Sequence, residues 1–449
     1  MNSDFSLHDL AEKVIRIGLS KGADQVEAYT LYGAVRGVQI ERGSIRRFTD
    51  TSNSGIGIRI LKNKATGMAS TTIFSQESIE KTVSEAVSLA KISPPDTNFI
   101  SLPSDTTPTP IIPDRCDDNI SELSIEDFTE LILATIQEAK IREDAIIGGN
   151  FSAGKGERYI INSAGVDRFS MQTSVSGFLS TKISEGDDIG SSYHYDAQTT
   201  LKKFDYLSIG KLSGERALKM LGAQKIDTTN LPILMDPETT YGTLAPILAN
   251  GINAFNVFNR TAFFVDKIGD QIGSPKLSVF DDPLYPGGVD SAPFDDEGVV
   301  PKKIQLVEEG ILQTYITDSY TAPLVELENT GHASRFSFAS KPRPSPYSLN
   351  FKNGDISKDA ILSDLKEGIL LIDSSLESSG NRPQISDQIN QGFYVKDGEI
   401  QYPVKEAVVG CTVYDIFDKI EEVSKETENR SGHIAPWILL SPIRISGGK

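Results

Sequence analysis

Apolar residues recur at helical spacing in five parts of the chain. The stripes predict amphipathic helices over residues 10–18, 79–90, 128–136 and 214–223, and one longer helix over about 239–258. The last pattern contains Pro246, which removes a backbone donor, so we expect a kink or a later helix start there.

Alternating apolar and polar residues predict strands between these helices. Strand signals dominate residues 25–74 and 145–195, and a two-residue periodicity of this kind is typical of sheets with one buried face. The C-terminal half contains shorter predicted strands. These are 232–236, 303–307, 310–316, 369–372, a short-loop hairpin over 392–402, and 439–445.

The order helix, antiparallel sheet, helix occurs twice, on either side of a segment rich in proline. We therefore divide the chain into an N-terminal α+β module (1–92), a linker over the surface (93–118), a central α+β module (119–228) and a β-rich C-terminal domain (229–449). The predicted class is α+β. The C-terminal domain should be a mostly antiparallel, sandwich- or barrel-like structure around one long helix.

Composition and charge narrow the class of protein. The chain has 449 residues, 24% of them charged and 38% hydrophobic, as in ordinary globular proteins. The net charge of -18 argues against a nucleic-acid partner. The two cysteines lie far apart, which excludes a disulfide framework. There is neither a signal-peptide pattern nor an apolar run of roughly 18 residues. We expect a cytoplasmic protein that does not bind a membrane.

Candidate chemistry is sparse. The carboxylates between Asp281 and Glu297 could form a hydrolase acid/base pair or a cation site, but acidic residues beside Pro and Gly more often cap turns. Cys411 follows an apolar run, which is typical of a buried, inert thiol. No histidine is followed by Glu, and no two of the four histidines are close in sequence. A helical zinc-peptidase motif is therefore absent.

Several short motifs together resemble the TldD/PmbA family, also called modulator of DNA gyrase proteins. The similarity covers essentially the whole chain and is strongest from Pro232 onward. The motifs are Phe-Asp-Asp-Pro at 280–283, Gly-Gly at 287–288, Phe-Asp-Asp-Glu-Gly at 294–298, Glu-Gly-Ile-Leu at 309–312 with Tyr315 and Asp318, Asn-Thr-Gly at 329–331 with Arg335, Gly-Phe at 392–393, Gly-Glu-Ile at 398–400 with Pro-Val at 403–404, and Ser-Gly-Gly at 446–448.

The resemblance implies a metal site that this chain lacks. The TldD branch of the family is a zinc peptidase with His-Glu-x-x-x-His on the long helix and a cysteine ligand near the C-terminus. In this chain Ala245, Pro246 and Asn250 stand at the positions of the motif. Residues 428–432 contain no cysteine, and the adjacent His433 has no partner ligands nearby in sequence. We therefore expect no catalytic residue, metal or cofactor in this chain, with zinc held by a TldD-type partner.

The resemblance thus predicts a PmbA/TldE-type subunit that is inactive alone and pairs with a TldD-type metallopeptidase to process unfolded peptides. Whether it forms homodimers in isolation is left open. The alternatives are a self-contained hydrolase using the acidic turns and a homodimeric binding or scaffold protein. The residues expected to shape a substrate groove or an interface are Asp295, Asp296, Glu297, Gly298, Asp318, Thr330, Gly331, His332 and Arg335.

Overall fold

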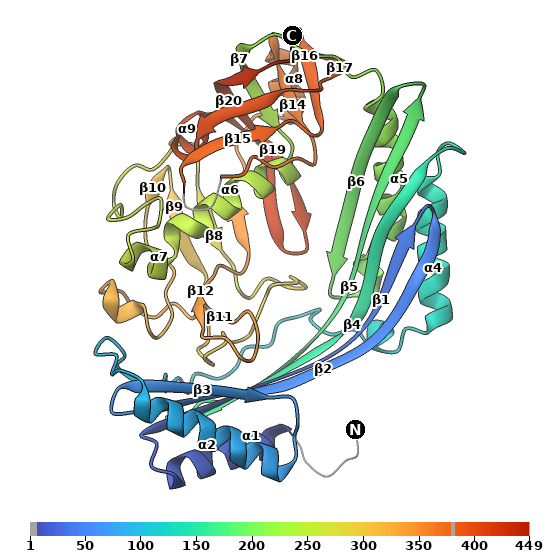
Figure 1. The fold of residues 1–449 in the computed structure, drawn as a ribbon. Helices are drawn as coiled ribbons and strands as arrows, with labels where there is room; N and C mark the ends of the chain where they lie inside the picture. The colour runs from blue at the N-terminus through green and yellow to red at the C-terminus, as the bar shows by residue number, and fades with distance from the viewer. Residues whose placement is uncertain (1–6, 379–381, 449) are drawn as a thin grey trace.

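A long, curved sheet wraps around the C-terminal domain (Figure 1). The computed structural model describes residues 7–378 and 382–448. Helices cover the outer, convex face of the sheet at both of its ends, and the inner face is turned toward the C-terminal domain.

The first end of the sheet carries the N-terminal helices. Helices α1 (Leu7–Ser20) and α2 (Gln76–Ile92) pack on strands β1 (Gln25–Glu41), β2 (Ser44–Lys62) and β3 (Ala65–Thr71). The predicted helices over 10–18 and 79–90 are therefore confirmed. The stripes on the two helices and alternate residues of the strands form one apolar core, which includes Val14, Val26, Ala28, Ile58, Ile60, Val83 and Ala86.

The other end of the sheet is built in the same way. Helices α4 (Ile125–Ala139) and α5 (Tyr206–Lys219) cover strands β4 (Ile146–Asn162), β5 (Asp167–Glu185) and β6 (Asp188–Gln198). Their core includes Phe128, Ile132, Phe151, Val175, Leu179 and Ile209. A short turn, η1 (Leu201–Lys203), precedes α5.

The prediction for α5 was wrong in its bounds. The helix begins after Asp205, whose side chain accepts a hydrogen bond from Ser208 N (3.1 Å), and it ends at Lys219 instead of spanning 214–223. Its buried face is made largely of small residues, which a search for large apolar side chains passes over. Gly210 shows why they are small, because a Cβ there would lie 2.0 Å from Thr135 O on α4.

The two helix–sheet–helix units share a single sheet. Its strand order is β3-β2-β1-β4-β5-β6, and β1 pairs with β4 from Glu27↔Asn162 to Ile40↔Gly149. Strand β1 contributes Val26 to the first core and Val38 to the second. Strands β2 and β4 also contribute to both cores, so the sheet runs without a break from one set of helices to the other.

The proline-rich segment lies between this sheet and the C-terminal domain. Phe99, Leu102 and Ile112 are buried. The Asp105 carboxylate accepts a hydrogen bond from Val300 N (2.7 Å), and the segment ends at the short helix α3 (Asp118–Ser121). The segment therefore packs inside the molecule along part of its length.

The C-terminal domain is an open, mostly antiparallel sheet packed on one central helix. Strand β7 (Thr229–Met235) lies between β14 (Glu367–Leu371) and β20 (His433–Ser446), and helix α6 (Pro237–Ile252) contacts β20. The other elements are α7 (Ala254–Phe258), β8 (Val279–Asp281), β9 (Ile304–Glu308), β10 (Ile311–Leu312), η2 (Ala322–Leu324), β11 (Ala333–Ser334), β12 (Arg343–Pro344), β13 (Leu349–Phe351), α8 (Lys358–Asp364), β15 (Gln384–Gln388), β16 (Gly392–Lys396), β17 (Glu399–Pro403), β18 (Val408–Thr412), α9 (Val413–Asp418) and β19 (Ile420–Arg430).

The α+β class is confirmed, with two local differences. Helix α6 continues through Pro246 and ends before Asn253, whose side chain caps α7 by accepting from Phe255 N (2.9 Å). The strand predicted over 310–316 is reduced to β10 because residues after Leu312 leave the sheet. No helix within residues 7–378 and 382–448 is long and apolar enough to cross a membrane.

Candidate functional site

The curved sheet and the C-terminal domain meet along a set of polar and charged side chains that are buried or partly buried, which we call the seam. The seam comprises Glu27, Tyr29, Arg59 and Arg158 from the sheet, and Asp295, Asp296, Glu297 and Arg335 from C-terminal turns. Arg59 Nη2 donates to Glu27 (2.6 Å) and to Glu297 (2.8 Å), and no side chain of this trio is more than 4% exposed. A guanidinium between two carboxylates compensates the cost of burying all three charges.

Arg335 extends the seam by a second set of contacts. Its Nη2 pairs with Glu27, and its guanidinium lies 4.7 Å from the centre of the Tyr29 ring. Its backbone N donates to Asp296 (2.6 Å), and Asp296 also accepts from Tyr29 Oη (2.8 Å) and Arg158. Every ionic group named here has an opposite charge beside it.

These neighbours decide which seam groups ionise readily. Burial disfavours the charged form of Glu27, yet Arg335 and Arg59 outweigh burial and hold the pKa of Glu27 below its ordinary value. Asp318 lies nearby and lacks such a partner. Burial, followed by repulsion from Glu297, raises the pKa of Asp318 to about 6.

Asp295 and Gly298 shape a tight turn. The Asp295 carboxylate accepts from Glu297 N (2.9 Å), Val299 N (2.8 Å) and Ala333 N (3.0 Å). Gly298 has φ +83°, and a Cβ there would lie 2.3 Å from a Val166 methyl group. The turn thereby brings Asp296 and Glu297 against the sheet.

Thr330, Gly331 and His332 directly precede Ala333, whose backbone N donates to Asp295. The hydroxyl of Thr330 accepts from Thr317 N (2.8 Å), and Gly331 fits against Pro301 with φ +72°. His332 is fully buried, with Nδ1 2.9 Å from Thr330 O and Nε2 3.0 Å from the Asp281 carboxylate. Both ring nitrogens are thus held by internal oxygens.

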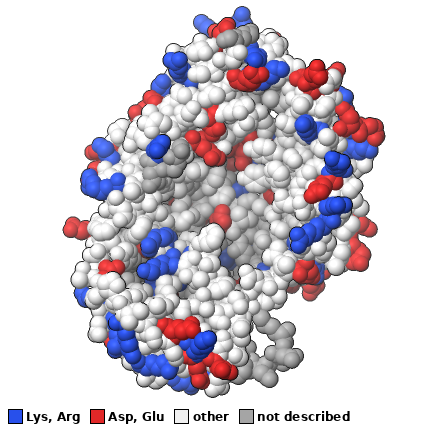
Figure 2. All heavy atoms as spheres, viewed as in Figure 1, with Lys and Arg blue, Asp and Glu red and all other residues white. Residues whose placement is uncertain are grey.

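Four of the nine residues that the sequence suggested for a groove or interface contact the curved sheet, namely Asp296, Glu297, Gly298 and Arg335. Asp295 shapes their turn, whereas Asp318, Thr330, Gly331 and His332 contact other residues of the C-terminal domain. Asp296 alone among the nine also lines a cleft. This cleft consists of two adjoining cavities of about 530 and 640 Å³, which share Arg115, Arg158, Gln172 and Asp296. Figure 2 shows the molecule hollowed at its centre, between the sheet and the C-terminal domain.

The second cavity is bounded by helix α6. Ala245 and Pro246, which the family resemblance places at the metal-motif positions, line it together with Ala249 on the same helix. Asn250 does not line this cavity, and its backbone carbonyl accepts a long hydrogen bond from Asn256 Nδ2 (3.4 Å). This wall of the cleft thus presents methyl groups and a proline ring.

The residues of this cavity do not fit a zinc ion. His433 is the histidine that lines it, and its ring nitrogens face Tyr241 Oη (2.6 Å) and Asp290 (2.9 Å). Within the described ranges, the group of three or more ligand-type side chains close enough to share an ion is His8, Asp9 and Glu12 on α1, away from the cleft. Cys411 is half-buried, and burial raises its pKa to about 12, as expected of an inert thiol.

Sequence reasoning missed the sheet's contribution to the site. Glu27 and Arg59 interrupt runs of buried apolar residues in β1 and β2, and Arg158 stands in an alternating strand. A charged residue in such a run signals a buried partner. The sequence therefore indicates that Glu27 and Arg59 have buried partners, but it does not identify those partners. Arg115 and Gln172 do not interrupt an apolar run, so the sequence gives no such indication for them.

Comparison with known proteins agrees with this architecture. The profiles of PmbA/TldA metallopeptidase domain 1, central domain and C-terminal domain match residues 26–90, 118–221 and 228–447. The metalloprotease PmbA homolog of Haemophilus influenzae is 27% identical over 411 residues, which cover 88% of this chain and 86% of that protein. The metalloprotease PmbA of Escherichia coli O157:H7 is 26% identical over 427 residues, covering 91% and 89%.

A solved structure shows the same fold. TldE from Thermococcus kodakarensis superposes with a TM-score of 0.86 at 23% identity and covers 98% of this chain and 100% of its own. The matched profiles span all three parts of the chain described above, and the motif at residues 294–298, together with Arg335, supplies the C-terminal residues of the seam. The chain belongs to the PmbA/TldD metallopeptidase family.

Proposed function

We propose that this chain is the non-catalytic, PmbA/TldE-type subunit of a heterodimeric zinc metallopeptidase that processes unfolded peptides in the cytoplasm. The observation that carries the proposal is the second cavity. Its volume of about 640 Å³ lies within the range of ligand-binding clefts, yet the resemblance puts Ala245 and Pro246 at the positions of the family's metal motif.

A TldD-type partner would supply the zinc and the water that it activates, while this chain contributes part of the binding surface. The cleft suits that role because it combines apolar walls with a few fixed polar groups, among them Arg115, Gln172 and Tyr241.

The self-contained hydrolase has weaker support. Asp281, Asp295 and Glu297 are fully buried, and each has its oxygens engaged by backbone N–H groups, by a histidine or by an arginine. Such carboxylates cannot reach a substrate in the cleft.

The test is cleavage of an unfolded peptide by three samples: this chain, a TldD-type partner, and the two mixed, with co-elution followed by size-exclusion chromatography. We expect co-elution and cleavage in the mixture that chelation abolishes, and no cleavage by this chain. Chelation-resistant cleavage by this chain would favour the hydrolase. A separate, homodimeric elution with no effect on the partner's turnover would favour a binding or scaffold protein.

A further inference from the structure

Arg115 is held firmly at the junction of the two cavities. Its backbone carbonyl accepts from Thr173 N (3.2 Å), and Asp117 N donates to the Thr173 hydroxyl (2.8 Å), which fixes this part of the linker to β5. The side chain lines both cavities. Its position is therefore set by the sheet and not by a mobile loop.

The guanidinium of Arg115 makes contacts with neutral acceptors. Nε donates to Met171 O (3.1 Å), Nη2 donates to Ser170 Oγ (3.1 Å), and Nη1 donates to Ser291 O. These bonds leave a hydrogen on each terminal nitrogen without an acceptor among the described residues. They orient the guanidinium but contribute no negative charge.

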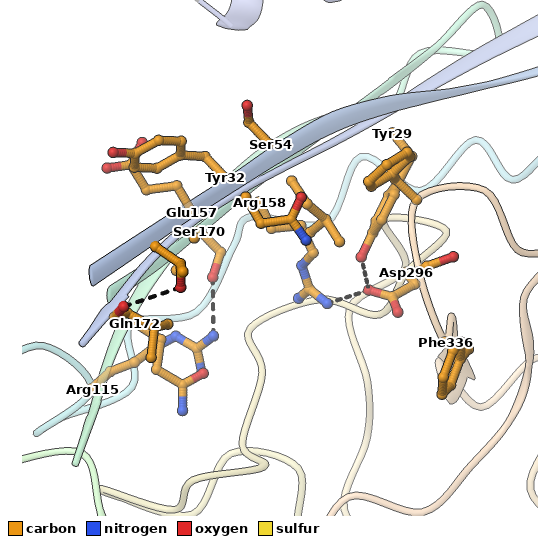
Figure 3. A pocket seen from close by; sticks show the side chains of 18 residues that line it. Tyr29, Tyr32, Ser54, Arg115, Glu157, Arg158, Ser170, Gln172, Asp296 and Phe336 are labelled. Atoms are coloured by element: carbon orange, nitrogen blue, oxygen red, sulfur yellow. Dashed lines mark hydrogen bonds and ion pairs between the residues drawn. The ribbon is translucent and has the colours of Figure 1, made fainter. Parts of the chain in front are cut away.

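No carboxylate within residues 7–378 and 382–448 forms an ion pair with Arg115, although ion pairs hold Arg59, Arg158 and Arg335. Figure 3 shows the difference: Arg158 points to Asp296, while Arg115 lies apart from Asp296 and beside Ser170. Asp296 is already engaged by Tyr29, Arg158 and Arg335 N. It is therefore not free to neutralise Arg115.

The environment of Arg115 disfavours its charge. Burial, followed by repulsion from Arg158, lowers the pKa of Arg115 to about 10, so the side chain remains cationic at neutral pH. A half-buried cation with no anion beside it gains more from an incoming anion than an exposed one would, because less solvent screens the pair.

We propose that the cleft binds peptides through a carboxylate that ion-pairs with Arg115. A guanidinium with one free hydrogen on each terminal nitrogen matches the two oxygens of a carboxylate. Phe336 is 100% exposed at the rim of the first cavity and offers an apolar surface to a neighbouring side chain. This inference deepens the proposed function and rests on it only in taking a peptide as the carrier of the carboxylate.

The carboxylate could be the C-terminus of the peptide or an acidic side chain, and three peptides distinguish the sources. They share one uncharged sequence of Ala, Leu, Ser and Gly with a fluorescent N-terminal label. One has a free C-terminal carboxylate, one a C-terminal amide, and one an amide with a single internal Glu. Affinity for the purified full-length chain is measured by fluorescence anisotropy.

We expect at least one acidic peptide to bind about tenfold more tightly than the amide, with the advantage falling as salt rises. Tighter binding of the free acid alone assigns the C-terminus, and tighter binding of the Glu peptide alone assigns the side chain. Inorganic phosphate is a competitor in a parallel titration and reports whether the site accepts other anions. Equal affinity for all three peptides would overturn the proposal.

Two variants connect the preference to Arg115. Arg115→Gln keeps hydrogen-bond donors but removes the charge, and it should bind all three peptides equally. Arg46→Gln removes a charge from a side chain that is 74% exposed on β2 and should keep the wild-type preference. A carboxylate preference that survives in a folded Arg115→Gln variant would overturn the assignment. Should that variant fail to fold, the wild-type comparison of the three peptides still decides.

These measurements are independent of the peptidase assay because they use this chain alone. A missing carboxylate preference together with partner-dependent cleavage would defeat this inference and leave the proposed function standing. A clear preference for carboxylate-bearing peptides, without any effect of this chain on a TldD-type partner, would support this inference and defeat the proposed function.

Discussion

The seam and the cleft both contain arginines at the junction of the sheet and the C-terminal domain, but the arginines differ in their partners. Arg59 lies between two carboxylates at 2.6 and 2.8 Å. Arg115 donates to two carbonyl oxygens and a hydroxyl. Both regions lie on the same inner face of one sheet, so the difference is not one of fold.

Charges that stabilise the fold therefore differ in their partners from charges that can bind a ligand. A buried charge whose partner lies in the same chain stabilises the native arrangement, because loss of either member leaves the other uncompensated. A charge that is oriented by neutral groups and left without a counter-ion can bind an external one. The family motifs identified residues whose partners lie in the same chain, since Asp295, Asp296, Glu297 and Arg335 are all seam residues.

The largest effect should come from breaking the seam. Arg59→Met leaves Glu27 and Glu297 buried without their shared cation, and we predict a loss of about 3–5 kcal/mol in the free energy of unfolding. Urea denaturation measures it. Arg46→Met is the matched control and should change stability by less than about 0.5 kcal/mol. A similarly small change in the free energy of unfolding for Arg59→Met would show that the seam does not stabilise the contact between the curved sheet and the C-terminal domain.

Asp318, which is repelled by Glu297 of the seam, makes the stability of the protein depend on pH. Its pKa is raised to about 6, and its Oδ2 is buried without a hydrogen-bond partner. The protonated form is therefore favoured on folding, and the stability it contributes at low pH is lost as pH rises through about 6.

Asp318→Asn should remove this dependence. Relative to the wild type, the variant's free energy of unfolding should increase by roughly 2 kcal/mol between pH 4 and pH 8. Chemical denaturation across that range measures the difference. A difference that stays constant with pH would mean that Asp318 ionises normally in the folded protein.

A third variant gives Arg115 in the cleft an internal carboxylate partner of the kind that Arg59 has in the seam. Ser170 Oγ lies 3.1 Å from Arg115 Nη2, so Ser170→Asp should place an internal carboxylate beside the guanidinium. We expect this variant to lose the roughly tenfold, or about 1.4 kcal/mol, preference for carboxylate-bearing peptides while remaining folded. Ser170→Asn, of similar size but uncharged, should retain the preference. Tight carboxylate binding by folded Ser170→Asp would place the binding charge elsewhere.

The smallest effect on stability should come from Phe336. Because its side chain is fully exposed, Phe336→Ala should alter the free energy of unfolding by less than about 0.5 kcal/mol. Its contribution should appear in binding, as weaker affinity for all peptides with the carboxylate preference intact. Thermal unfolding and anisotropy on the same sample test both statements, and a selective loss of the carboxylate preference would contradict them.

Periodicity was sufficient for the helices and strands whose buried faces consist of large apolar residues. It failed at α5, because its buried face contains Gly210 and Gly214, which are small enough for close packing on α4, and Ser213, which hydrogen-bonds with Thr181 of β5. It also failed to show that β1 crosses two cores, since pairing with β4 joins segments far apart in the sequence.

The site was predictable only where local sequence carries the information. The turn around Asp295 and Gly298 is visible from its Asp and Gly residues, and the missing metal ligands on α6 are visible directly. The pairing of Arg59 with Glu297 is a property of the assembled fold. The same is true of Arg115, since its missing counter-ion can be recognised only once every neighbouring side chain is known.

The central claim is that this chain binds peptide without binding a catalytic metal. The most direct measurement is the zinc retained per chain after incubation with zinc and removal of free ions, made on the same sample that is assayed for peptide affinity. We expect substoichiometric zinc, no cleavage and undiminished peptide binding. One tightly held zinc per chain accompanied by peptide cleavage would show that the chain carries its own catalytic site.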